Sequence, residues 1–214
     1  ALQTNTTSTG NAAFGMQALK DNTGGDNTAV GLNALEQNTT ASNNSAVGRG
    51  ALAANTTGTL NVAVGSYALD ANTTGDNNTA IGQGSLTVAT TADNNTAVGH
   101  ASLHLTSTGA NNTAVGKDAL RANTTASYNT GVGYNALYAN QTGTRNTSIG
   151  AFALEDNTGS NNTGCGYGSL AQNTSGSSNT AVGDHALTNN TTASHNTAVG
   201  LNALTENTTG IDLV

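Results

Sequence analysis

Histidine, cysteine and paired carboxylates are the residue types in this chain that could carry out acid–base, nucleophilic or metal chemistry. The chain has four histidines, at His100, His104, His185 and His195, and one cysteine, Cys165. Catalytic sites hold a nucleophile, a base and an orienting group within hydrogen-bond reach. No serine, cysteine or carboxylate recurs at a fixed spacing from these histidines. The sequence therefore predicts no enzyme, no catalytic residue, no metal site and no cofactor.

Composition and charge exclude other classes of function. The chain has five Lys and Arg against twelve Asp and Glu, a net charge of −7, which argues against a nucleic-acid partner or an anionic lipid surface. No stretch approaches 18 apolar residues, so we expect no membrane insertion by this segment. A single cysteine excludes an intramolecular disulfide framework.

A repeat of seventeen residues organises the whole chain, and each copy contains a glycine that closes a segment such as Asn-Thr-Ala-Val-Gly. We number positions within a copy from this anchor glycine. Successive anchors are 17 residues apart except for two spacings of 16, where Asn-Thr-Thr-Gly has shortened to Asn-Thr-Gly. Because a lost residue is tolerated there, that segment is expected to be a loop. The twelve anchors are Gly15, Gly31, Gly48, Gly65, Gly82, Gly99, Gly116, Gly133, Gly150, Gly166, Gly183 and Gly200.

Two positions of the repeat hold one residue type in every copy. Leucine stands four residues after the anchor and is predicted to form the core: Leu19, Leu35, Leu52, Leu69, Leu86, Leu103, Leu120, Leu137, Leu154, Leu170, Leu187 and Leu204. Asparagine stands four residues before it and is predicted to form a structural ladder of stacked amides: Asn11, Asn27, Asn44, Asn61, Asn78, Asn95, Asn112, Asn129, Asn146, Asn162, Asn179 and Asn196.

This mixture of fixed and free positions is typical of a solenoid. The segment Thr-Ala-Val alternates β-branched residues and predicts a short strand, and the following glycine permits a corner. We therefore expect an all-β parallel β-solenoid, or β-roll, of about twelve rungs, with residues 1–214 as a single repeat domain. Parallel strands lie only about 4.8 Å apart, too close for stacked helices. The second leg of each rung is accordingly predicted to be extended or a single helical turn.

Each rung offers two sizeable apolar side chains for burial, the leucine and the Val or Ile just before the anchor, where Cys165 is expected as a small buried substitute. This is little burial for seventeen ordered residues. We therefore expect the chain to associate with itself, as a homotrimer or as an end-to-end filament, within a longer fibre. Variable positions hold five aromatic residues that are candidate contacts, namely Tyr67, Tyr134, Tyr138, Phe152 and Tyr167.

Two further interpretations of the Asn- and Thr-rich segments stay open. Asn-x-Thr sequons make the chain a candidate glycosylated extracellular filament, although such matches also arise from composition and turn preferences. The weak candidate acceptors are Asn38, Asn55, Asn72, Asn123, Asn190 and Asn207. Nine of the twelve copies have a threonine three residues before the anchor. This column suggests ice binding, or binding to another flat surface, as a function, although the neighbouring residue on the same face is valine.

The repeat Asn-Thr-Ala-Val-Gly-x-x-Ala-Leu, clearest from Asn112 to Leu120, resembles the head repeat of trimeric autotransporter adhesins. It is even more similar to Asn-Thr-Thr-Gly-rich repeats of bacterial and phage fibre proteins that precede an endosialidase-type chaperone. The adhesin coil is shorter, and the additional residues here fall in the Thr-Thr-Gly segment. The resemblance implies a left-handed parallel β-roll in a homotrimer, a structural fibre shaft or adhesive head at a cell or virion surface, and a host-surface glycan or protein as partner.

Overall fold

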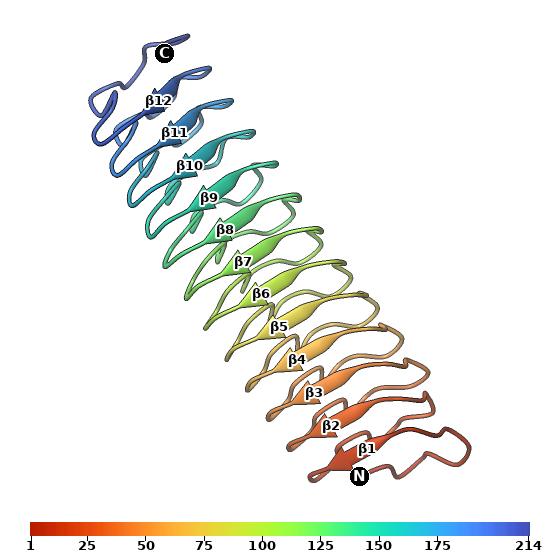
Figure 1. Cartoon of the computed structure of the whole chain (residues 1–214). Helices are drawn as coiled ribbons and strands as arrows, with labels where there is room; N and C mark the ends of the chain where they lie inside the picture. The colour runs from red at the N-terminus through yellow and green to blue at the C-terminus, as the bar shows by residue number, and fades with distance from the viewer.

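A stack of short parallel strands forms the framework of the molecule. The computed structural model describes residues 1–214. The strands pair in chain order to form one twelve-stranded sheet (Figure 1). They are β1 (Ala12–Phe14), β2 (Thr28–Val30), β3 (Ser45–Val47), β4 (Val62–Val64), β5 (Thr79–Ile81), β6 (Thr96–Val98), β7 (Thr113–Val115), β8 (Thr130–Val132), β9 (Thr147–Ile149), β10 (Thr163–Cys165), β11 (Thr180–Val182) and β12 (Thr197–Val199). The predicted all-β parallel solenoid is confirmed.

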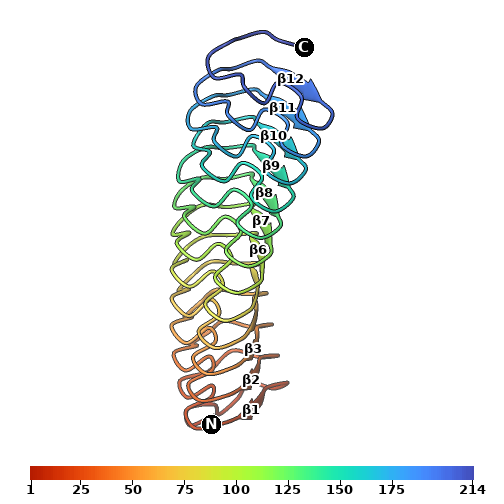
Figure 2. The same cartoon turned by 90° about the vertical axis from the view of Figure 1, so that its left-hand side faces the viewer.

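Neighbouring strands pair in register along the whole rod. Thr96 of β6 lies opposite Thr113 of β7, and in all the remaining strand pairs the same positions of the repeat also face each other. The register also holds across a shortened repeat, where Thr147 of β9 lies opposite Thr163 of β10. The connecting segment therefore absorbs the missing residue, and the sheet is undisturbed. The rungs form an elongated rod with the termini at its two ends, and the rod bends gently when seen from the side (Figures 1 and 2).

The anchor glycine makes the corner after each strand. The φ angle of Gly48 is +135°, a value that side-chain-bearing residues rarely adopt. An added Cβ at Gly48 would also lie 2.5 Å from the carbonyl oxygen of Gly65 in the next rung. Both the backbone conformation and the close stacking of rungs therefore require glycine here.

The second leg of each rung contains no helix and consists of tight turns. Within one rung, the N–H of Ala51 donates to the carbonyl of Gly48 at 3.3 Å, and the N–H of Ala53 donates to that of Gly50, also at 3.3 Å. Leu52, in the second of these turns, has a φ of +52°. Its own N–H donates to Ala68 of the next rung at 3.1 Å. The leg is thus bonded both within its rung and to its neighbours, at a spacing that a stacked helix could not reach.

The core is narrow and consists of leucine and alanine. Leucines at position +4 from Leu19 to Leu187 are fully buried, and Leu204 in the last rung is partly buried. The strand contributes its middle residue, such as Ala97 of β6, which has no exposed surface. An added Cβ at Gly131 of β8 would lie 3.3 Å from Leu120, so the leucine fills the space beneath the strand. The chain contains no helix that could cross a membrane.

The expectation that the Val or Ile before the anchor is buried was wrong. Val115 and Ile149 expose 37% and 45% of their surface. In a strand, successive side chains point to opposite faces, so an inward Ala places both flanking residues outside. Since the leucine already fills the interior, only a small side chain fits beneath the strand. Cys165 takes the valine position in β10 and is therefore partly exposed on the outside, not buried as expected.

Candidate functional site

The histidines, the cysteine and the carboxylates, which could carry out chemistry, are dispersed along the rod. No group of three or more His, Cys, Asp or Glu side chains could hold a metal ion, and the surface has no pocket. His104 Nδ1 lies 3.0 Å from the carbonyl oxygen of Gly84, a backbone contact. His185 touches Asp184, and His195 Nδ1 lies 4.0 Å from Asp212 in an exposed loop. None of these pairs comes together with a nucleophile.

The predicted asparagine ladder lies inside the coil, before each strand; we call it the strand ladder. A second buried column, seven residues after the anchor, forms what we call the turn ladder. In one rung, Nδ2 of Asn44 and Nδ2 of Asn55 both donate to the carbonyl of Gly58 at 2.9 Å. Asn44 Oδ1 accepts the N–H of Asn61 at 2.9 Å, and Asn55 Nδ2 also donates to Asn38 Oδ1 at 2.8 Å. The amides thus close each rung on itself and join it to both neighbours.

The turn ladder contains the asparagines that the sequence offered as glycosylation acceptors. Asn38, Asn55, Asn72, Asn123 and Asn190 are fully buried, and only Asn207 in the last rung is partly exposed. The amide nitrogen that would carry the glycan already donates to a carbonyl oxygen, as from Asn190 to Ala193 at 3.0 Å. A glycan on the five buried residues is incompatible with the folded coil.

The turn ladder is interrupted at Asn140, whose buried Oδ1 has no partner although Asn157 follows in a shortened repeat, and where the repeat departs from asparagine. Ala89 occupies this position in one rung, and the buried Oδ1 of Asn72 in the preceding rung consequently has no hydrogen-bond partner. Thr106 occupies it in the next rung and accepts a hydrogen bond from Asn123 Nδ2 at 3.2 Å. The gap at Ala89 therefore leaves an unpaired buried acceptor, which is unfavourable in a protein interior.

A third column of polar side chains lies two residues before the strand ladder and was not predicted from the sequence. The N–H of Asp76 donates to Asp93 Oδ1 of the next rung at 2.8 Å, and the N–H of Ser177 donates to Ser194 Oγ at 3.0 Å. These side chains take the place of backbone acceptors in the loop. The signal in the sequence was the recurrence of Ser, Asp or Thr at this position in most repeats.

The largest regular surface of the molecule is the outer side of the sheet, which we call the strand face. It is formed by the first and third residues of each strand, mostly threonine and valine. The face runs the full length of the rod, with the strands side by side (Figure 1). At about 4.8 Å per strand, it is about 55 Å long. The column of mostly Val and Ile is largely exposed here although it is apolar, so the strand face is the main candidate for an interaction surface.

The threonine hydroxyls of the strand face differ from those in the loop. In the loop, the hydroxyl of Thr39 donates to the carbonyl of Thr56 at 2.8 Å, and most copies repeat this bond. On the strand face, the hydroxyls of residues such as Thr96 and Thr113 make no hydrogen bond within the chain. They are free to bind water or another molecule.

The sequence indicated five aromatic residues as candidate contacts with a partner, and three of them lie together in the structure. Tyr134, Phe152 and Tyr167 lie in consecutive rungs just after their strands, with ring centroids 5.1 and 5.5 Å apart. Tyr67 lies four rungs from Tyr134, and the guanidinium carbon of Arg49 lies 4.6 Å from the centre of its ring. Tyr138 lies on another side of the coil, where its hydroxyl accepts a hydrogen bond from an arginine.

Comparisons of the chain with protein-family models, with curated proteins and with solved structures gave no significant match. The β-solenoid architecture is therefore established by the structure, and the similarity to adhesin and fibre repeats depends on the repeat pattern alone.

Proposed function

We propose that this chain is a structural segment of an extracellular fibre, displayed on a cell or virion surface, in which copies associate side by side through the strand face. The observation that supports the proposal best is the largely exposed column of mostly Val and Ile, beside the threonine column, that runs the length of the rod. The strand face measures about 55 Å by about 10 Å, and a long exposed apolar column of this kind is typical of an interaction surface. Burying it against a second copy would remove these side chains from water.

The length and monotony of the rod also support a structural role. Each rung repeats the same bonds to its neighbours, so the rod has the same cross-section along its length. Stiffness and reach follow directly from such a stack, and no pocket is needed for them. The resemblance to adhesin heads suggests three copies, and we adopt a parallel homotrimer as the working assembly.

The oligomeric state tests this proposal. We expect sedimentation equilibrium to give a trimer for the natural chain and a monomer for the double variant Ile81→Glu/Val115→Glu, which places charges in the strand face. The control Thr125→Glu changes an exposed loop residue and is expected to leave the trimer intact. A monodisperse monomer of the natural chain would refute the proposed association.

Cys165 reports the direction of packing. It stands in the valine column of β10, so copies that pack in parallel and in register bring two Cys165 side chains to the same height. Mild oxidation is then expected to give a covalent dimer. In an antiparallel arrangement, β10 would face β3, and Cys165 would cross-link only after a Val47→Cys substitution. That result would exclude the parallel assembly.

The free hydroxyls favour ice binding as a second candidate function. A column of unbonded threonine hydroxyls beside a column of valine methyls can order water at regular intervals. This function requires an uncovered strand face and therefore a monomer. Thermal hysteresis that disappears in a Thr96→Lys/Thr113→Lys variant would support it, whereas a stable trimer without hysteresis would exclude it.

A further inference from the structure

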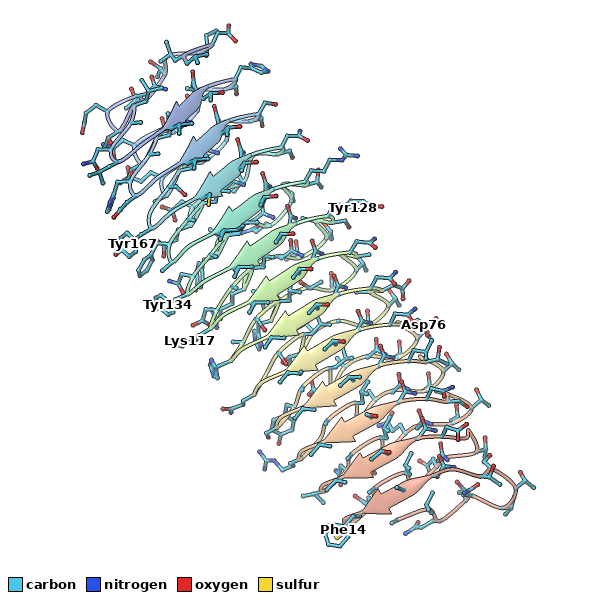
Figure 3. The ribbon with its side chains drawn as sticks, in the orientation of Figure 1. Phe14, Asp76, Lys117, Tyr128, Tyr134 and Tyr167 are labelled. Carbon is cyan, nitrogen blue, oxygen red and sulfur yellow. The ribbon has the colours of Figure 1, made fainter.

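A row of exposed and partly exposed aromatic rings lies along one edge of the rod, beside the strand face. We call it the aromatic row; it consists of Tyr134, Phe152, Tyr167 and His185, one from each of four consecutive rungs. The ring centroids are 5.1, 5.5 and 5.3 Å apart in order. Tyr134 and Tyr167 project from the same edge, and Lys117 lies on that edge in the rung before Tyr134 (Figure 3). The row therefore follows the axis of the rod at a spacing of one ring per rung.

The fold does not need aromatic residues at these positions. Equivalent sites in other rungs hold Gly50, Gln83 and Gly84, which form the same corner. Tyr134 and Tyr167 expose 43% and 49% of their surface, so the rings cover little of the core. Four of the seven Tyr and Phe residues occupy these two positions of the repeat, three of them in adjacent rungs. Such exposed aromatic clustering is typical of a binding surface.

The shape of the surface limits the class of ligand. The rod has no pocket, so a ligand must lie along the row instead of entering a cavity. An extended peptide would need an open sheet edge, but β8 to β11 are each paired on both sides. A polyanion is disfavoured by the net charge of −7, and the one nearby amine, of Lys117, already lies 5.4 Å from the centre of the Tyr134 ring. A neutral, extended and repetitive chain remains.

We propose that the aromatic row binds an extended neutral polysaccharide whose sugar rings lie along the axis of the rod. The faces of pyranose rings carry C–H groups, which are attracted to the electron-rich faces of tyrosine rings. Tyr134 and Tyr167 occupy the same position of the repeat two rungs apart, about 10 Å. They are therefore placed to contact alternate sugars of an extended glycan. Asp184, next to His185 in sequence, has a side chain that is 53% exposed and supplies carboxylate oxygens that accept hydrogen bonds from sugar hydroxyls.

Affinity electrophoresis tests this proposal with defined probes. Gels would contain hydroxyethylcellulose, arabinoxylan or galactomannan, three soluble neutral polysaccharides with extended backbones. We expect at least one of them to retard the natural chain, and Tyr134→Ser/Tyr167→Ser to weaken that retardation about tenfold. The tyrosine emission of this tryptophan-free chain should change on binding, since two of its five tyrosines lie in the row.

The matched control is Tyr128→Ser, which removes a tyrosine that is 60% exposed on the opposite edge of the rod (Figure 3). We expect it to bind as the natural chain does. The proposal is overturned if none of the three polysaccharides retards the natural chain, or if the control loses binding equally. Circular dichroism verifies that each variant is folded. Sedimentation of the same samples separates this result from the proposed trimer, because a monomer that still binds polysaccharide would refute the assembly alone.

Discussion

At the scale of single residues, the repeat identifies the interior well but assigns one column to the wrong side. Apart from Asn11 and Leu204 in the end rungs, the asparagines of the strand ladder and the leucines at position +4 are buried, and both were found from positions that never vary. The valines were wrongly predicted to be buried, because periodicity alone cannot tell which face of a three-residue strand points inward. The missed signal was size: the middle strand residue is only ever Ala, Gly or Ser, such as Ala114 or Gly131, which indicates the crowded side.

The gap in the turn ladder gives a prediction about stability. Replacing Ala89 by Asn supplies a donor for the unpaired Oδ1 of Asn72, as Asn55 Nδ2 does for Asn38 Oδ1 at 2.8 Å. We expect a gain of about 1 kcal/mol in the free energy of unfolding. Thermal denaturation measures it, with Ala54→Asn at a partly exposed position as the control. A lower melting temperature for Ala89→Asn would show that this rung has no room for the amide.

Asp70 gives a prediction about pH. Burial raises the pKa of its carboxyl group above the ordinary value, more than backbone hydrogen bonds and the charge of His104 lower it. The folded chain therefore binds this proton more tightly than the unfolded chain, and stability falls as the pH rises from the ordinary pKa through the raised one. We expect Asp70→Asn to raise the melting temperature at pH 7 and to leave it unchanged at pH 3, where the natural carboxyl is already neutral.

The control for this measurement is Asp156→Asn, which changes an exposed carboxylate. It should have little effect at either pH. An equal effect of Asp70→Asn at both pH values would mean that the shape of the side chain, and not its ionisation, is responsible.

At the scale of the structural elements, the strand and the corner were predictable, and the second leg was not. Alternating β-branched residues followed by glycine indicated both the strand and its end. The second leg carries a leucine in a left-handed conformation in every rung, as at Leu120 with a φ of +52°. Local propensity disfavours this conformation. Hydrogen bonds to both neighbouring rungs impose it, and these bonds are not visible within one repeat.

The corner glycines give a test of stacking. Gly65 has a φ of +133°, and an added Cβ would lie 2.6 Å from the carbonyl oxygen of Gly82. We expect Gly65→Ala to cost about 2 kcal/mol or more. Gly131→Ala is the control, because most strands have alanine at that position, and it should cost less than about 1 kcal/mol. Chemical denaturation compares the two, and equal losses would contradict the requirement for glycine at the corner.

At the scale of the whole molecule, the rod is a sum of similar units that contact only their neighbours. The number of rungs was predictable from the anchors, because each anchor marks one strand. The bend of the rod was not, because it arises from small rotations between rungs that no single repeat encodes (Figure 2). Stability in such a stack is approximately the sum of the rungs and their interfaces.

Removal of one complete repeat tests this additivity. Deleting residues 113–129 joins Asn112 to Thr130 and keeps the strands in phase. We expect a folded rod shorter by about 4.8 Å, measured by small-angle X-ray scattering, with a slightly lower melting temperature. Deleting residues 113–121 instead removes about half a repeat, so the residues that follow no longer match the repeat positions before the deletion. We expect this variant to lose the β-sheet signal in circular dichroism. If both deletions unfolded the chain equally, the rungs could not be independent units.

The in-register pairing across the shortened repeats has a consequence for how such a gene can change. Recombination between any two copies yields a product whose strands still align, and the connecting loop tolerates the loss of a codon. Unequal crossing-over can therefore lengthen or shorten the rod in small steps, without any intermediate form that fails to fold.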